Sequence, residues 1–311
     1  RLYRMIEATK NNCIDLSDLG LLQVTGKHAK QFLQGQLTCN LDEVNEHQTR
    51  LGAHCDVKGR VQTTFFFFFY QNAYYFLLLL YMVQHLLVTL KKYAVFSKVD
   101  LSDVSDNWQK IGVYGSGIAA LLRTQKLYTK EENGLVAHEP TLSLSIPGPS
   151  PRFILLSSSH KSITFIVTTC SPQTLNDWYL FDIMAGVPTI YPETSAKFTP
   201  HQLNYPALGG VSFNKGCYIG QEIIARTQYL GKPKSRLYRV SFQANKQVLP
   251  GTSLLEKGEQ TSKGTVIMSA KDGFNHYQAL VCLQNQAISH TIYLGNAEAS
   301  LINLLKLPYS I

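Results

Sequence analysis

One cysteine lies in a setting that could make its thiol reactive. Cys217 stands in the stretch Lys215–Glu222, close to a lysine and between two glycines. Ile219, Ile223 and Ile224 follow at helical spacing, so a helix is expected to begin at or just after the cysteine. A thiol beside an ammonium group and near the positive end of a helix dipole ionises more readily, which makes it a better nucleophile or metal ligand. A lone cysteine is as often a small core residue, and the residues alone leave both interpretations open.

Strands and helices are expected to alternate before this stretch. Strand-like pieces at 13–16 and 21–24 precede a helix over 27–37, and residues 51–62 predict two strands that turn at Lys58-Gly59. This order is typical of an α+β domain.

The apolar run from Phe65 to Leu90 is long enough to be considered as a membrane span. The polar pair Gln71-Asn72 interrupts it, and aromatic residues on both sides favour strands. We therefore predict a hairpin, Phe65–Tyr70 with Tyr74–Leu80, and then a helix from about Met82 to Tyr93. No membrane segment is expected.

The middle of the chain predicts further elements. A strand that leads to Gly112 precedes a helix over 118–126, and residues 135–159 are predicted to be loop and edge strand. Residues 163–169 are rich in β-branched side chains and predict a buried strand, and 175–184 predicts an amphipathic helix.

After residue 231 the pattern changes to short strands separated by turn residues. A linker at 231–234 is followed by predicted strands at 237–242, 264–268, 277–282 and 290–294.

Composition limits the classes of protein to consider. A chain of 311 residues, 45% hydrophobic and 16% charged, can fold into about two domains. The net charge of +8 favours an acidic ligand or partner, although scattered basic residues favour a solvated surface over a nucleic-acid groove. The six cysteines lack C-x-x-C or zinc spacing, which predicts reduced thiols in a cytoplasmic protein and no metal site. Residues 1–12 lack the apolar core of a signal peptide.

The stretch Lys215–Glu222, Lys-Gly-Cys-Tyr-x-Gly-Gln-Glu, resembles the signature of the YgfZ-type folate-binding proteins, relatives of the glycine-cleavage T-protein that support iron–sulfur enzymes. The resemblance implies an α+β fold, with T-protein-like N-terminal lobes of antiparallel sheet and helices in residues 1–236 and a small antiparallel barrel in 237–311. Further runs match in the family's order and extend the resemblance over most of the chain: 24–26, 32–36, 53–60, 90–96, 181–188, 198–200, 204 and 207–213.

The resemblance also implies roles for single residues. Cys217 would be the reactive thiol, with Lys215 favouring its ionised form, and the neighbouring Tyr218, Gln221 and Glu222 would shape a site for tetrahydrofolate or a derivative. Trp178 precedes the family's Ala-Gly-x-Pro turn, where a tryptophan is associated with folate binding. An indole face suits a flat pterin or aminobenzoyl ring, and a core tryptophan is the alternative.

Three positions differ from the family pattern. Residues 59–64 carry no carboxylate where relatives place an aspartate near the pterin, Met184 replaces a glutamate, and Leu19 lies where some members have a second tryptophan. Without a fixed carboxylate, acid–base chemistry is missing at that place. We therefore expect folate to be bound rather than turned over.

The function implied by the resemblance is that of a cytoplasmic, monomeric accessory protein. It would bind folate and support the assembly or repair of iron–sulfur enzymes, among them radical-SAM enzymes that modify tRNA. Because a stable cluster normally needs four ligands, Cys217 alone would hold iron or sulfide only transiently, or form a mixed disulfide. Two alternatives stay open: a folate-dependent one-carbon transferase, and a module that binds tRNA directly.

Overall fold

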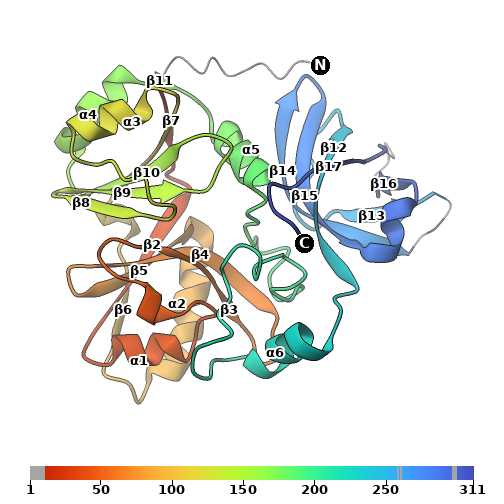
Figure 1. Ribbon diagram of the computed structural model, residues 1–311, viewed down its shortest axis with the longest axis horizontal. Helices are drawn as coiled ribbons and strands as arrows, with labels where there is room; N and C mark the ends of the chain where they lie inside the picture. The colour runs from red at the N-terminus through yellow and green to blue at the C-terminus, as the bar shows by residue number, and fades with distance from the viewer. Residues whose placement is uncertain (1–10, 258, 260, 296–299) are drawn as a thin grey trace. The chain divides into compact units, whose positions relative to one another are not determined.

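The computed structural model describes residues 11–257, 259, 261–295 and 300–311. They form an α+β protein with three sheets (Figure 1). Strand pairing is mainly antiparallel, whereas the short strands β1 (Asn12–Asp15) and β11 (Ser171–Pro172) pair parallel. The predicted fold class is confirmed. Residues 1–10, on which most of the signal-peptide expectation rests, lie outside the described residues.

The chain divides into two compact units, each assembled from separate segments. Of the described residues, the first unit takes those up to 29 together with 42–50 and 66–178, and the second takes 30–41, 51–65 and 179–311. Strand β4 (Val61–Tyr70) therefore belongs to both units. The boundary predicted at residue 236 falls inside the second unit and stays a prediction.

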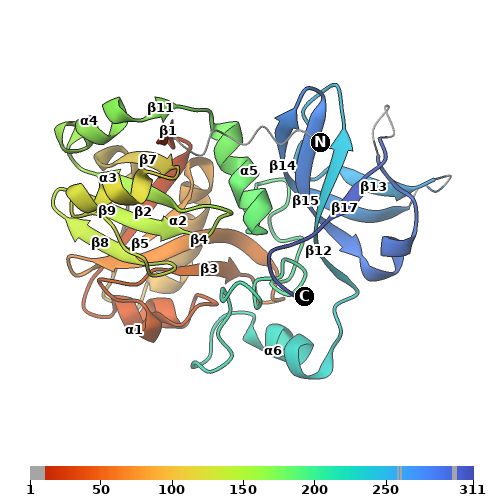
Figure 2. The same ribbon diagram turned by 45° about the horizontal axis from the view of Figure 1, so that its top comes forward.

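A six-stranded sheet of the first unit has the order β11-β1-β7-β10-β9-β8. Helices α3 and α4 lie beside this sheet (Figure 2), and their apolar residues share one core with β7 and β10. The elements are β1 (Asn12–Asp15), β7 (Gln109–Tyr114), α3 (Ile118–Thr124), β8 (Leu135–His138), β9 (Thr141–Ile146), β10 (Arg152–Ser157), α4 (His160–Thr169) and β11 (Ser171–Pro172).

Two predictions in this sheet region are wrong. Residues 135–159 form three strands rather than loop and edge strand, and β10 is an interior strand with every residue buried. Residues 163–169 lie in helix α4 rather than in a strand. There Ile163 and Ile166, three positions apart, enter the core, while the hydroxyls of Thr164 and Thr168 donate to carbonyl oxygens four residues earlier. Packing of one helix face thus outweighs the β preference of these residues.

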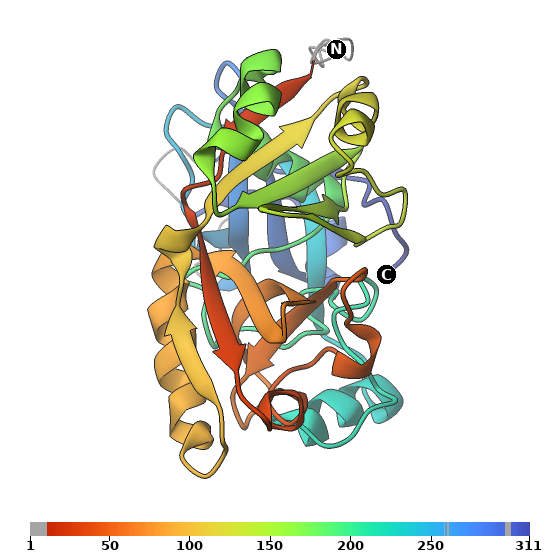
Figure 3. The same ribbon diagram turned by 90° about the vertical axis from the view of Figure 1, so that its left-hand side faces the viewer.

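The five-stranded sheet has the order β3-β4-β5-β2-β6, with helix α2 packed against β2, β5 and β6 (Figure 3). The predicted hairpin and helix are confirmed. Gln71 and Asn72 have φ of 48° and 59°, and so form a two-residue loop with both residues in the left-handed region, as tight hairpins require. The elements are β2 (Leu19–Thr25), β3 (Arg50–Cys55), β4 (Val61–Tyr70), β5 (Ala73–Leu79), α2 (Leu80–Ala94) and β6 (Asp100–Asp103).

Among the described residues, none of the helices has both the length and the apolar character needed to cross a membrane. The long apolar run is instead divided between β4, β5 and α2.

The last part of the second unit is a six-stranded antiparallel sheet that curls into a half-barrel, in the order β16-β13-β14-β15-β12-β17. Its core includes Phe242, Leu254 and Val281. The four predicted strands are present, and the short strands β13 and β17 were not predicted. The elements are β12 (Ser235–Gln243), β13 (Ser253–Glu256), β14 (Ser262–Gly273), β15 (His276–Gln284), β16 (Ile292–Leu294) and β17 (Asn303–Leu305).

Three helices carry the segments around the predicted site. They are α1 (Ala29–Gln34), shorter than the predicted 27–37, α5 (Leu175–Ala185), close to the prediction, and α6 (Gln221–Leu230).

Candidate functional site

The loop that carries Cys217 runs from residue 208 to 220 and is fastened to the rest of the second unit through Thr38. The Thr38 hydroxyl donates to the carbonyl oxygen of Gly210 at 2.6 Å and accepts from the amide of Ala53 at 2.9 Å. The amide of Ser212 donates to the Thr38 carbonyl at 2.8 Å. One buried threonine thus links the loop to strand β3.

Lys215 anchors the loop a second time. Its ammonium donates to the carbonyl oxygens of Leu37 and Cys39, each at 2.8 Å, and lies 5.0 Å from the ring centroid of Tyr218. Hydrogen bonds from a charged donor are stronger than neutral ones. Lys215 therefore holds the turn after α1, and its predicted influence on the Cys217 thiol stays a prediction.

A close contact between two glycines fixes the end of the loop. Gly220 has φ 81°, and a Cβ there would lie 2.5 Å from the Asp56 carbonyl oxygen and 2.9 Å from the Cα of Gly59. Gly59 has φ 67°, and its Cβ would lie 3.2 Å from the Gly220 oxygen. Only residues without a side chain allow this approach of two backbones. Gly220 of the signature and Gly59 thus join the loop to the turn between β3 and β4.

Helix α6 begins later than predicted. Its first residue is Gln221, four positions after Cys217, because Gly220 is in the left-handed conformation, which a right-handed helix cannot include. The predicted helix start at or just after Cys217 is therefore wrong, and the thiol is not part of the first helical turn. Gln221 accepts a hydrogen bond from the Tyr218 amide through its side-chain oxygen at 3.3 Å, and Glu222 is exposed in the first helical turn.

Cys217 is the exposed member of the chain's six cysteines, all of which lie in the described part of the chain. The other five are buried, and desolvation raises the pKa of the Cys170 thiol to about 11 and that of Cys282 to about 12. The alternative that Cys217 is a core residue is therefore wrong. It is the thiol that a partner or a reagent can reach.

Tyr218 points inward instead. It is buried, and within the described residues its hydroxyl oxygen has no hydrogen-bond partner. Burial, with a further contribution from Cys55, raises the pKa of the phenol, which stays neutral. Tyr218 thus anchors the loop, and its predicted contact with folate stays a prediction.

Trp178 is a buried tryptophan, 3% exposed, at the end of the first unit. Its ring packs so closely on Gly112 that a Cβ there would lie 2.6 Å from the indole Cζ3. The guanidinium of Arg152 lies over this ring, 4.7 Å from its centroid. Nε of Arg152 also donates a hydrogen bond to the carbonyl oxygen of Pro147 at 2.7 Å. Sequence reasoning missed the fully buried Arg152, because a single arginine at a strand start gives no sign of burial. The role of Trp178 in folate binding stays a prediction.

Aromatic contacts hold the second half of α6. The ring of Phe213 lies 6.2 Å from that of Tyr229 at an interplanar angle of 72°, and Nε2 of His201 lies 3.0 Å from Oε1 of Gln228. Burial lowers the pKa of His201, with Arg236 lowering it further against the effect of Gln228. The contact between His201 and Gln228 keeps α6 next to the segment that precedes the loop.

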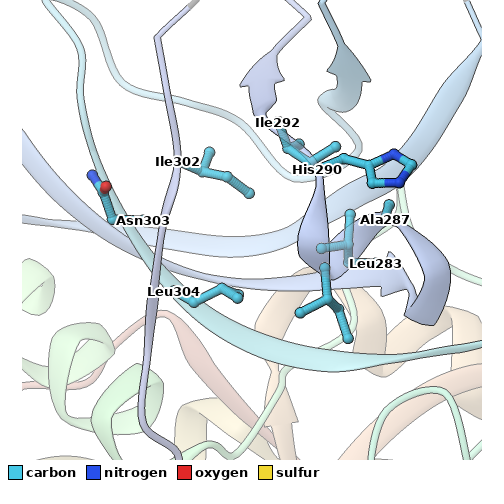
Figure 4. Close-up of a pocket in the computed structure, with 8 residues that line it drawn as sticks. Leu283, Ala287, His290, Ile292, Ile302, Asn303 and Leu304 are labelled. Atoms are coloured by element: carbon cyan, nitrogen blue, oxygen red, sulfur yellow. The ribbon is translucent and has the colours of Figure 1, made fainter.

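The half-barrel has an apolar pocket of about 290 Å³ near its edge (Figure 4). Leu283, Ile292 and Ile302 line it, and His290 lies at its rim with Nδ1 2.9 Å from Oε2 of Glu256. None of the predicted site residues lines this pocket. Across the described ranges, no three or more His, Cys, Asp or Glu residues are grouped to hold a metal ion.

Relatives from three organisms align with most of this chain. It is 36% identical over 277 residues to the tRNA-modifying protein YgfZ of Hamiltonella defensa subsp. Acyrthosiphon pisum (strain 5AT), covering 86% of this chain and 82% of that protein. It is 33% identical over 305 residues to that of Photorhabdus laumondii (96% and 92% covered), and 31% identical over 319 to that of Colwellia psychrerythraea (100% and 97% covered). The chain belongs to the YgfZ family.

The fold of this YgfZ-family chain is that of the glycine-cleavage T-protein. The crystal structure of the aminomethyltransferase T from Bartonella henselae matches with a TM-score of 0.72 and covers 96% of this chain and 86% of that one. Sequence identity is 12%, so the match shows the fold alone. No protein-family profile matches the chain.

Residues 59–64, which lack the aspartate expected from the family pattern, lead into strand β4 and form its start. Oε1 of Gln62 is buried there without a hydrogen-bond partner among the described residues, while the Gln62 carbonyl accepts from Ser195 Oγ at 2.7 Å. Thr64 Oγ1 accepts from the Ile190 amide at 3.0 Å. A buried carboxamide oxygen without a partner can accept a hydrogen bond from a ligand. The residues present therefore fit a ligand that has N–H donors, such as a pterin, without supplying a carboxylate.

Proposed function

We propose that this YgfZ-family chain is a folate-binding accessory protein that supports the assembly or repair of iron–sulfur enzymes, including radical-SAM enzymes that modify tRNA. The name of its relatives, tRNA-modifying protein, and the T-protein fold support this proposal. A monomeric state and a cytoplasmic location are part of it. The observation that carries it is the exposure of Cys217 on a loop that is otherwise firmly anchored.

The anchored loop gives Cys217 a fixed position without enclosing it. Lys215 and Tyr218, on either side, hold the loop to the protein, while the thiol itself is exposed. A thiolate in this position would bind an iron ion as a transient ligand, or attack a partner's disulfide and release one of its sulfurs as a thiolate. Because a stable cluster needs more ligands, the client enzyme would supply the others.

Folate binding is the second part of the proposal. Gln62 would bind the pterin through its buried carboxamide. Contacts with folate are also predicted for Trp178, Tyr218, Gln221 and Glu222. A bound tetrahydrofolate would supply a one-carbon carrier or a reductant. The chain's own residues would orient it by hydrogen bonding and exclude water.

A folate-dependent transferase is less well supported. The carboxylate closest in sequence to the start of β4 is that of Asp56, whose Oδ1 accepts from the amides of Lys58 and Arg60 at 2.9 Å each. Asp56 therefore stabilises the turn before β4. General acid–base chemistry at the pterin would need a further carboxylate.

The experiment that tests the proposal replaces the thiol. Cys217→Ala and Cys217→Ser would be expressed in cells that lack the native protein, and the activity of an iron–sulfur enzyme would be measured together with the abundance of each variant. The matched control is Gly216→Ala, because a Cβ there meets no atom within 4 Å. We expect both cysteine variants to lose activity at normal abundance and the control to keep it. Full activity of both cysteine variants would refute a role for the thiol.

Two binding measurements separate the alternatives. Tetrahydrofolate should bind the wild-type protein measurably more tightly than the Gln62→Leu variant, because leucine removes the buried acceptor. A direct tRNA-binding module would instead bind tRNA with micromolar affinity and a steep dependence on salt concentration, and we expect little such binding.

A further inference from the structure

A second pocket, of about 340 Å³, lies within the first unit and is independent of the loop that carries Cys217. Its wall contains Gln23 from β2, Tyr75 from β5 and Tyr70 from the end of β4. Trp108, just before β7, and Glu139, in the turn between β8 and β9, also line it. Its volume is within the range of small-molecule sites.

Three aromatic rings form one side of this pocket. Trp108 stands edge-on to Tyr70, with centroids 6.2 Å apart at 75°, and edge-on to Tyr75, with centroids 6.3 Å apart at 77°. The tyrosines are buried and Trp108 is half-buried, so the indole is the more accessible ring. In such T-shaped pairs the edge of one ring rests on the face of the other, and Tyr75 also stacks on Phe68 with centroids 5.0 Å apart at 9°, so a ligand in the pocket meets chiefly the indole of Trp108.

A single carboxylate supplies the charge. Glu139 is exposed at the rim, and the described residues that line the pocket include no Lys, Arg or His. Burial, with a contribution from Glu139, raises the pKa of Tyr70 to about 12, and burial raises that of Tyr75, so both phenols are neutral at physiological pH. The described residues of the lining thus contain one negative charge and no positive one, in a chain whose net charge is +8.

The polar atoms of the lining already have partners. Oε1 of Glu139 accepts from the Tyr70 hydroxyl at 3.2 Å and from Nε2 of Gln71 at 2.6 Å, and Nε2 of Gln23 donates to the Tyr75 hydroxyl at 2.7 Å. A ligand that depends on many directional hydrogen bonds would have to displace these. A ligand whose charge is spread over alkyl groups would not, because its attraction to ring faces and to a carboxylate needs no hydrogen bond.

We propose that the pocket formed by Tyr70, Tyr75, Trp108 and Glu139 binds a small organic cation with a methylated or quaternary ammonium head. The indole of Trp108 attracts the cation, Tyr70 and Tyr75 form the aromatic wall behind it, and Glu139 supplies the counter-charge. This site is separate from the proposed folate and thiol functions, and neither outcome for them affects it.

The test uses the full chain, choline as the cation, and 3,3-dimethyl-1-butanol as its neutral isostere. The chain has two tryptophans, so its indole N–H region in a proton–nitrogen NMR spectrum contains two signals, which Trp178→Phe assigns. Choline should shift the Trp108 signal in a saturable way and leave that of Trp178 in place. The neutral isostere should bind at least about fivefold more weakly, because it lacks the cation–π attraction.

Two variants locate the binding. Trp108→Leu should weaken choline binding by about two- to thirtyfold, and Glu139→Gln by about two- to fivefold. The control Glu132→Gln removes an exposed carboxylate outside the pocket and should have no effect. Trp108→Leu would be followed through the amide signals of neighbouring residues, since its indole is gone.

Two results would overturn the proposal. One is equal affinity for choline and its neutral isostere in the wild-type protein, a comparison that needs no variant. The other is the absence of any saturable shift of the Trp108 signal at concentrations that leave the protein folded. Unchanged choline affinity in a folded Glu139→Gln protein would also contradict the role of the carboxylate.

Discussion

Three glycines of the signature region allow a graded test of how the Cys217 loop is held. At Gly220 an alanine would have φ 81° and a Cβ 2.5 Å from the Asp56 carbonyl oxygen, which is backbone and cannot rotate away. At Gly209 it would have φ 69° with no atom within 4 Å of the Cβ. At Gly216 an alanine would have neither a left-handed φ nor an atom within 4 Å of its Cβ. The three substitutions add the same methyl group and differ only in strain and collision.

The expected losses of unfolding free energy follow from these differences. An alanine in the left-handed conformation costs about 1–2 kcal/mol. Alanine also makes the unfolded chain less flexible than glycine does, which offsets part of that cost, so Gly209→Ala should cost about 1 kcal/mol. Gly220→Ala adds a backbone collision of about 1–3 kcal/mol to the same net cost and should cost about 2–4 kcal/mol in all. Gly216→Ala should be within about 0.5 kcal/mol of the wild type.

Urea denaturation gives the stability of each variant, and the rate at which a thiol reagent modifies Cys217 reports on the loop itself. We expect Gly220→Ala to be the least stable and to change the Cys217 rate, because the loop must leave the turn before β4. If Gly220→Ala were as stable as Gly216→Ala, the contact between Gly220 and Gly59 would not hold the loop.

Three further predictions concern the same unit. A maleimide should label the native protein at one thiol per chain, and Cys217→Ser should abolish this labelling, as mass spectrometry would show; a second fast thiol would contradict the burial of the other five. Lys215→Met should cost about 1.5–3 kcal/mol, because it removes a charged donor from two carbonyl oxygens, whereas the exposed Lys58→Met should change stability little in the same urea assay. Burial lowers the pKa of folded His201 below its unfolded value of about 6.5, so the unfolded chain binds more protons and stability should fall as pH falls below about 6.5. His201→Gln should flatten that part of the pH profile, and an unchanged slope would contradict the assignment.

The sequence predicts best those elements in which local and long-range preferences agree. The Gln71-Asn72 turn interrupts the apolar run at the place where the hairpin turns, and α2 has a regular apolar face. The main strands of the half-barrel are separated by turn residues and were predicted for the same reason.

The failures occur where packing opposes local preference. α4 contains β-branched residues that favour strands, yet its Ile163 and Ile166 complete a helical face against the core. β10 follows a stretch rich in proline and glycine, and its interior place in the sheet depends on β7, about 40 residues earlier.

The signature identifies the family, but its geometry could not be predicted from the octet alone. The late start of α6 depends on the contact between Gly220 and Gly59, and the exposure of Cys217 depends on anchors at Thr38 and Leu37. These partners are more than 150 residues away in the chain. Spacing within the octet contains no information about them.

The interleaving of the two units has a consequence for synthesis of the chain. The segments at 30–41 and 51–65 leave the ribosome early, but 113 residues (66–178) of the first unit follow before the remainder of the second unit is made. Because domains tend to fold as units during translation, the first unit has most of its chain well before the second can close. A fragment that starts at residue 179 would contain the Cys217 thiol without Thr38, Leu37 or Gly59, and its loop would therefore lack the contacts that anchor it to earlier parts of the chain.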